Sequence, residues 1–115
     1  MNRKLIYQKY DGHCAYCGAE ITLREMQVDH IKPKCFSGTD EEKNLNPSCR
    51  YCNNYKCNFT VEEFRYYAKQ MLNERLDYLF KSKTKMMVAV NFGTISLAKW
   101  DGMFYFEQYE MNHIE

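Results

Sequence analysis

The sequence lacks any long hydrophobic run. No stretch approaches the roughly 18 apolar residues of a membrane-spanning helix, and residues 1–10 contain no apolar segment of signal-peptide length. Internal repeats and low-complexity linkers are also missing. We therefore expect a single domain over residues 1–115, located in the cytoplasm and without a membrane partner.

An excess of charge of one sign is missing as well. The chain has 16 Lys and Arg against 15 Asp and Glu, which gives a formal net charge of +1 at pH 7. Four thiolates around one Zn²⁺ would bring this value close to −1. A general basic field for nucleic-acid binding is therefore excluded. Any phosphate contact has to be local and assisted by a metal ion.

Cysteine, in contrast, is abundant, with six residues. Four of them form two Cys-x-x-Cys pairs, Cys14 with Cys17 and Cys49 with Cys52. In an intracellular protein this spacing indicates a metal site rather than disulfides, and four thiolates complete the tetrahedral coordination of Zn²⁺. We expect a structural zinc site. The two remaining cysteines, Cys35 and Cys57, are expected to be buried or half-buried free thiols.

Between the cysteine pairs lies a segment suited to phosphodiester hydrolysis, Asp29-His30-Ile31-Lys32-Pro33. Such hydrolysis needs an activated water, a cation on the phosphate and a stabilised leaving oxygen. His30 is the predicted general base, because a neutral imidazole can take up a proton near pH 7. Asp29 and Asn53 offer hard oxygen atoms that suit Mg²⁺ or Mn²⁺.

Each of these residues also has a purely structural interpretation. His30 could be a hydrogen-bonded histidine of the fold or a ligand of the zinc site. Asp29 could close a hairpin through a hydrogen bond, and Asn53 could be an amide on a helix surface.

With these residues in view, the segment from Cys14 to Lys56 resembles the HNH endonuclease family. The matching sequence motifs are Cys14-x-x-Cys17-Gly18, Val28-Asp29-His30-Ile31-x-Pro33, Gly38, and Asn44-Leu45-x-Pro47-x-Cys49-x-x-Cys52-Asn53-x-x-Lys56. The resemblance implies a ββα-metal finger with a core over residues 14–57. It implies a strand that ends at Asp29 and His30, a short strand near Asn44 and Leu45, and a helix that carries residues 49–56.

The resemblance also implies roles for two asparagines. Asn44 would tie the loop and orient His30, although a simple turn residue explains it nearly as well. Asn53 stands where many family members have the last histidine of the trio, a change that should favour Mg²⁺ and Mn²⁺ over Ni²⁺ and Zn²⁺. Many family members have two glycines where this chain has Phe36-Ser37-Gly38. The difference puts in doubt that the loop fits its substrate as it does in the family.

Lys56 is the predicted phosphate contact. It follows Asn53 by three residues and would share its helix face. Arg50 could add a second contact, but a solvated side chain is the ordinary interpretation of such a residue.

Residues 60–115 form a predicted extension that is helical at first. Thr60-Val61-Glu62-Glu63 is a capping box, which predicts that a helix starts there, and apolar residues at helical spacing continue it toward Gly93. Residues 86–90 fit either a helix or a strand. After Asp101-Gly102, the aromatic segment 103–107 predicts a terminal strand or hairpin. The fold class is therefore α+β, a small zinc-braced finger with a C-terminal helical segment and a terminal strand.

The predicted function is metal-dependent hydrolysis of DNA phosphodiester bonds, with double-stranded DNA as the expected partner. One finger would nick one strand, so a double-strand cut needs a homodimer or two encounters. The alternative is a catalytically silent HNH scaffold of phage or mobile-element origin that inhibits or docks on another nuclease complex. An RNA-directed nuclease would use the same chemistry.

Overall fold

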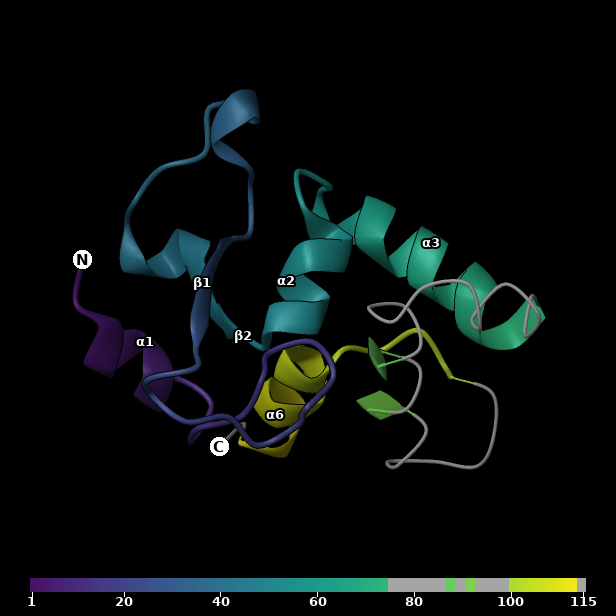
Figure 1. Cartoon of the computed structure of the whole chain (residues 1–115), viewed down its shortest axis with the longest axis horizontal. Helices are drawn as coiled ribbons and strands as arrows, with labels where there is room; N and C mark the ends of the chain where they lie inside the picture. The colour runs from purple at the N-terminus through teal and green to yellow at the C-terminus, as the bar shows by residue number, and fades with distance from the viewer. Residues whose placement is uncertain (75–86, 89–90, 93–99, 114–115) are drawn as a thin grey trace.

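The computed structural model describes residues 1–74, 87–88, 91–92 and 100–113 (Figure 1). No helix in these ranges is both long and apolar enough to cross a membrane. Helices, 3-10 helices (η) and a two-stranded antiparallel sheet give a small α+β fold, as predicted. In chain order the elements are α1 (Arg3–Gln8), β1 (Gln27–His30), η1 (Lys34–Phe36), η2 (Glu42–Asn44), β2 (Leu45–Ser48), α2 (Arg50–Lys56), α3 (Val61–Glu74) and α6 (Tyr105–Asn112).

The sheet is a hairpin with a long connection. β1 pairs with β2 in a register that places Asp29 opposite Asn46 and His30 opposite Leu45. Both strands lie where the resemblance to the HNH endonuclease family predicted them. Pro47 can sit inside β2 because a two-stranded sheet leaves one edge of each strand without a ladder partner. The connection between the strands contains η1 and η2 and emerges at the end of β1 that carries His30 (Figure 1).

The helix α2 starts at the second cysteine pair. Cys49 is its N-cap, and the Cys49 sulfur accepts a hydrogen bond from the backbone N–H of Cys52 at 3.3 Å. An N-cap acceptor satisfies a helix N–H that has no partner within the helix. The cysteine spacing therefore serves the helix as well as the predicted metal site.

The capping box at the start of α3 is confirmed. The Glu63 carboxylate accepts from the Thr60 N–H at 2.9 Å, and the Thr60 hydroxyl accepts from the Glu63 N–H at 3.1 Å. The expected stop at Gly93 lies outside the described residues. Within the segment expected as helix or strand, Met87 and Val88 are helical.

The predicted terminal strand over residues 103–107 is wrong. Phe104 is the N-cap of α6, and its N–H donates to the Glu107 carboxylate at 2.9 Å. The next two N–H groups, those of Tyr105 and Phe106, donate to the carbonyls of residues 16 and 15 at 3.1 and 2.7 Å. A helix forms because the rest of the fold supplies these acceptors, whereas the strand propensity of aromatic residues depends on context.

An aromatic cluster joins the two ends of the chain. The ring of Tyr16 meets Phe64, Phe104 and Phe106 edge-on, with ring centroids 5.3, 5.2 and 5.9 Å away. Tyr16, Phe64 and Phe104 are fully buried. Figure 1 shows α6, in yellow, by the N-terminal segments to which its first N–H groups are hydrogen-bonded. The predicted role of the aromatics as core is therefore confirmed for this cluster.

Candidate functional site

The four cysteines of the two pairs form one buried cluster. Their sulfur atoms all lie within 4.8 Å of one another, and Cys17 and Cys49 are 3.9 Å apart. A tetrahedral Zn²⁺ bound at about 2.3 Å would place its sulfur ligands roughly 3.8 Å apart. None of the four is in a disulfide. The cluster therefore fits a single metal ion.

Hydrogen-bond donors surround these sulfur atoms. The N–H of Tyr16 donates to Cys14 at 3.5 Å, and the side-chain amide of Asn91 donates to Cys17 at 3.6 Å. Donors of this kind stabilise thiolates and are typical of the surroundings of metal ligands. Asn91 shows that the C-terminal half also contributes to the site.

The other two cysteines correct a sequence-based expectation. Cys35 lies in η1 and Cys57 follows α2, and both are exposed rather than buried. They are short apolar side chains in polar connecting segments, where no core is available to cover them.

His30 ends β1 with its imidazole partly open to solvent. The side chain is 24% exposed, and its Nε2 lies 2.7 Å from Oδ1 of Asp40. The other oxygen of Asp40 contacts Nζ of Lys34 at 3.2 Å. An ionised carboxylate only accepts hydrogen bonds, so Nε2 is the donor in this contact, and in a neutral imidazole the free lone pair is then on Nδ1. The sequence analysis missed Asp40, because the path of the loop decides which acidic residue reaches His30.

Asp29 points to the opposite face of β1, as strand alternation requires. It is only 3% exposed, with Oδ2 accepting from the Tyr16 hydroxyl and Oδ1 contacting Nζ of Lys56 at 3.2 Å. Burial raises the pKa of Asp29, and the charge of Lys56 and the Tyr16 hydrogen bond act against this rise. Both carboxylate oxygens are therefore engaged inside the protein.

Lys56, the predicted phosphate contact, is turned into the protein interior. Its side chain is fully buried, and Nζ donates to the backbone carbonyl of His30 at 2.9 Å as well as to Asp29. The helix α2 turns Lys56 toward the sheet, where the buried carboxylate of Asp29 requires a counter-ion. In this structure Lys56 neutralises Asp29 and does not face solvent.

Tyr16 is a second residue that the sequence analysis did not assign to the site. Burial and the neighbouring Asp29 carboxylate raise the pKa of its phenol well above the ordinary value. The hydroxyl therefore stays protonated and donates to Asp29. Its position between Cys14 and Cys17 placed it near the predicted metal site. That spacing did not predict its hydrogen bond to Asp29, which lies 13 residues further along the chain.

Asn44 ties the loop that follows β1. Its Oδ1 accepts from the Lys32 N–H at 2.8 Å, and its Nδ2 donates to the carbonyls of Lys32 and Thr39 at 3.1 and 2.8 Å. The backbone carbonyl of Asn44 also accepts from the N–H of Ile31 at 2.8 Å. Asn44 thus holds both ends of the loop that brings Asp40 to His30.

The last two predicted residues lie on α2. Asn53 is half-buried, and its side-chain amide makes no hydrogen bond to any residue that the structure describes. Arg50 is exposed at the start of the helix, with its guanidinium 5.3 Å from the centroid of the Tyr51 ring. Both side chains are available to a ligand.

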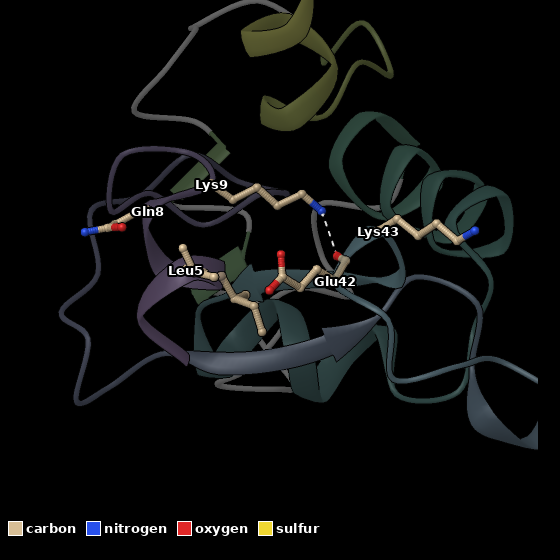
Figure 2. Close-up of a pocket in the computed structure, with 6 residues that line it drawn as sticks. Leu5, Gln8, Lys9, Glu42 and Lys43 are labelled. Carbon is tan, nitrogen blue, oxygen red and sulfur yellow. Dashed lines mark hydrogen bonds between the residues drawn. The ribbon is translucent and has the colours of Figure 1, made fainter. Parts of the chain in front are cut away.

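A pocket lies apart from these residues. Figure 2 shows it between α1 and the segment around η2, with the ammonium of Lys9 donating to the carbonyl of Glu42 at 3.3 Å. Its volume is about 370 Å³, and Leu5, Ile6, Gln8, Lys9, Glu42 and Lys43 line it. None of the predicted site residues belongs to this lining, so the site described above lies outside it.

Part of the chain is similar to known proteins. Residues 14–59 match the family model "HNH endonuclease". The CRISPR-associated endonuclease Cas9 of Corynebacterium diphtheriae is 40% identical over 52 residues, which cover 44% of this chain and 5% of that protein. A crystal structure of the Type II-C Cas9 enzyme from Actinomyces naeslundii aligns with a TM-score of 0.45 and 21% identity, over 78% of this chain and 11% of that chain.

The matched segment contains both cysteine pairs, the hairpin and α2. The chain spans only about a twentieth of the curated relative's length. Residues 14–59 therefore match the HNH endonuclease family model, and we call this part of the chain the HNH domain.

Proposed function

We propose that this protein is a metal-dependent endonuclease that hydrolyses DNA phosphodiester bonds, with His30 as general base. The observation that supports this most directly is the state of the imidazole. His30 is anchored at a strand end, partly open to solvent, and bonded to a carboxylate through Nε2, which leaves Nδ1 to accept a proton from water. The match of residues 14–59 to a nuclease family supports the same reaction class.

Two metal ions have separate tasks in this proposal. A structural Zn²⁺ is held by the four clustered cysteines, whose sulfur spacing suits it. A Mg²⁺ or Mn²⁺ would use the oxygen atoms of Asp29 and Asn53 and would stabilise negative charge on the phosphate. The amide of Asn53 is available, whereas Oδ1 of Asp29 is held by Lys56. A divalent ion bound to Oδ1 of Asp29 would therefore have to replace the ammonium of Lys56 there.

The remaining polar residues have supporting roles. Asn44 holds the loop beside His30 through its three side-chain hydrogen bonds. Arg50 is the proposed phosphate contact, because it is exposed on the helix that also carries Asn53.

The proposed substrate is double-stranded DNA. One domain has one base, so it nicks one strand, and a double-strand cut requires a homodimer or two encounters. A protein partner could supply the sequence selectivity, since the net charge of +1 gives no general attraction to DNA. We place the activity in the cytoplasm, because reduced thiols for a zinc site persist there.

One observation favours a second candidate, a catalytically silent scaffold that binds another protein. Asp29 and Lys56 neutralise each other in the interior, an arrangement that is complete without a divalent ion. A protein that has lost catalysis would keep this pair for its fold. Against it, such a protein has no chemical need for the His30 imidazole and the Asn53 amide.

A plasmid-nicking assay separates the two candidates. The zinc-loaded protein, His30→Ala and His113→Ala are compared with Mg²⁺, with Mn²⁺ and with EDTA. His113 is the matched control, since it is an exposed histidine at the end of α6. We expect nicking only with a divalent ion, a loss of about 10²–10⁴-fold in His30→Ala, and no change in His113→Ala. A folded native protein that cleaves no DNA with either ion would favour the scaffold.

A further inference from the structure

The loop between the strands places a carboxylate on the proposed base. Asp40 Oδ1 lies 2.7 Å from Nε2 of His30, although the two residues are ten positions apart in the chain. Lys34 contacts the other oxygen of Asp40 at 3.2 Å. The hydrogen bond from His30, followed by that from Lys34, lowers the pKa of the Asp40 carboxyl. Asp40 therefore stays ionised at neutral pH and acts only as an acceptor.

The backbone on the N-terminal side of Asp40 is fixed. The carbonyl of Thr39 accepts from Nδ2 of Asn44 at 2.8 Å, and the N–H of Gly38 donates to the carbonyl of Pro33 at 3.0 Å. Gly38 is packed so closely that a Cβ there would lie 1.7 Å from the carbonyl oxygen of Lys32. Only glycine fits at this approach, so the close packing of Gly38 helps to fix the loop that places the carboxylate of Asp40 near His30.

We propose that Asp40 is the positioning residue of the general base: it holds the proton on Nε2 of His30 and leaves Nδ1 free to take a proton from the attacking water. This inference rests on the proposed function of His30. As Nδ1 takes the water proton, the ring becomes an imidazolium, which the negative charge of Asp40 stabilises. Because the Asp40 side chain is 57% exposed, its ion pair contributes little to folding stability. Removing the Asp40 carboxylate should therefore lower the rate of hydrolysis rather than unfold the protein.

A neighbouring residue gives a matched control. Glu41 lies in the same loop, is 60% exposed, and contacts Lys43 at 3.2 Å. Glu41→Gln removes the same charge as Asp40→Asn but leaves the His30 contact in place. Asp40→Glu keeps the charge and tests whether a carboxylate on a longer side chain restores the contact.

The experiment combines nicking kinetics with NMR of the histidine ring. For Asp40→Asn we expect kcat to fall about 10- to 100-fold, a part of what a general base supplies, with KM unchanged. Glu41→Gln should behave like the native protein, and Asp40→Glu should recover part of kcat. The ¹⁵N chemical shifts should show His30 protonated on Nε2 in the native protein and in Glu41→Gln, and a mixture of tautomers in Asp40→Asn.

The two readouts fail in different ways. Equal kcat in Asp40→Asn and Glu41→Gln, or an unchanged tautomer in Asp40→Asn, would overturn the positioning role. A native protein that cleaves no DNA, while its tautomer still depends on Asp40, would overturn the proposed function and with it the catalytic meaning of the contact.

Discussion

The HNH domain and the C-terminal helices are held together by different forces. In the domain, the cysteine cluster and the pair of Asp29 with Lys56 occupy the interior. Between α3 and α6, the tilted rings of Phe64 and Phe104 and the ion pair of Arg65 with Glu107 make the contacts. A two-stranded sheet and a short helix bury too little apolar surface to be stable alone, so polar and metal-binding groups replace part of a hydrophobic core.

Tyr16 connects the two regions. Its ring belongs to the aromatic cluster with Phe64 and Phe104, while its hydroxyl donates to Asp29. The backbone carbonyl of Tyr16 also accepts from the first turn of α6. The C-terminal helices therefore support the orientation of a residue in the proposed site.

The largest effect should follow removal of the metal. Structural zinc contributes about 10–16 kcal/mol in zinc-finger peptides, as much as the whole stability of an ordinary domain. We expect chelation, or Cys52→Ser, to unfold the HNH domain and to release α6, whose N–H partners lie in the first cysteine pair. Near-UV circular dichroism and zinc content would show this, with recovery on adding Zn²⁺ to the chelated native protein. Cys35→Ser, an exposed site outside the cluster, is the control, and a chelated protein that keeps its near-UV signal would contradict the expectation.

Local patterns in the sequence, together with the family resemblance, were sufficient to predict the main elements of the HNH domain. The cysteine spacing and the capping box at Thr60 depend on residues a few positions apart, and the structure has the cysteine cluster and the capped helix as predicted. The positions of the two strands followed from the resemblance to the HNH endonuclease family, and the structure has both strands there as well. The same reasoning could not give the contacts of the site. Lys56 reaches Asp29 across 27 positions, and Asp40 reaches His30 through a loop whose path the sequence does not specify.

The failure at residues 103–107 has the same cause. The segment has strand-forming aromatics, but its backbone N–H groups find carbonyl partners about 90 residues earlier in the chain and start a helix. One signal was present, since Glu107 stands three residues after Phe104 as in a capping box. Phe104 lacks the hydroxyl that would have made the motif recognisable.

The second-largest effect should come from the buried ion pair. Lys56→Met leaves the carboxylate of Asp29 buried with no counter-ion, which costs about 3–5 kcal/mol. Urea denaturation of the zinc-loaded protein measures this loss. The double variant Asp29→Asn with Lys56→Met removes both charges and should recover most of the stability. If the single variant is as stable as the double variant, the interior of the domain does not depend on this pair.

A smaller effect is expected at the contact between α3 and α6. Both terminal nitrogens of the Arg65 guanidinium donate to the Glu107 carboxylate, at 2.7 and 2.9 Å. Glu107 also accepts from the N–H of Phe104. Partial burial would raise the pKa of Glu107, but the Arg65 hydrogen bonds more than offset this and lower it. Glu107→Gln should cost about 1–2 kcal/mol, because charge-assisted hydrogen bonds are stronger than neutral ones and this pair is partly solvated. The midpoint of urea denaturation measures it.

The smallest effect belongs to the other carboxylate on the same guanidinium. Glu62 contacts Arg65 from within α3 at 3.0 Å, but its side chain is 77% exposed, against 30% for Glu107. Solvent screens such a pair, so Glu62→Gln should cost at most about 0.5 kcal/mol in the same denaturation experiment. Both substitutions remove one negative charge from Arg65, so the difference between the two losses measures what Glu107 adds by its lower exposure, its contact between two helices and its hydrogen bond to Phe104. Equal losses would mean that Glu107 acts only as a local partner of Arg65, and that the aromatic cluster and the backbone hydrogen bonds of Tyr105 and Phe106 hold α6 without this ion pair.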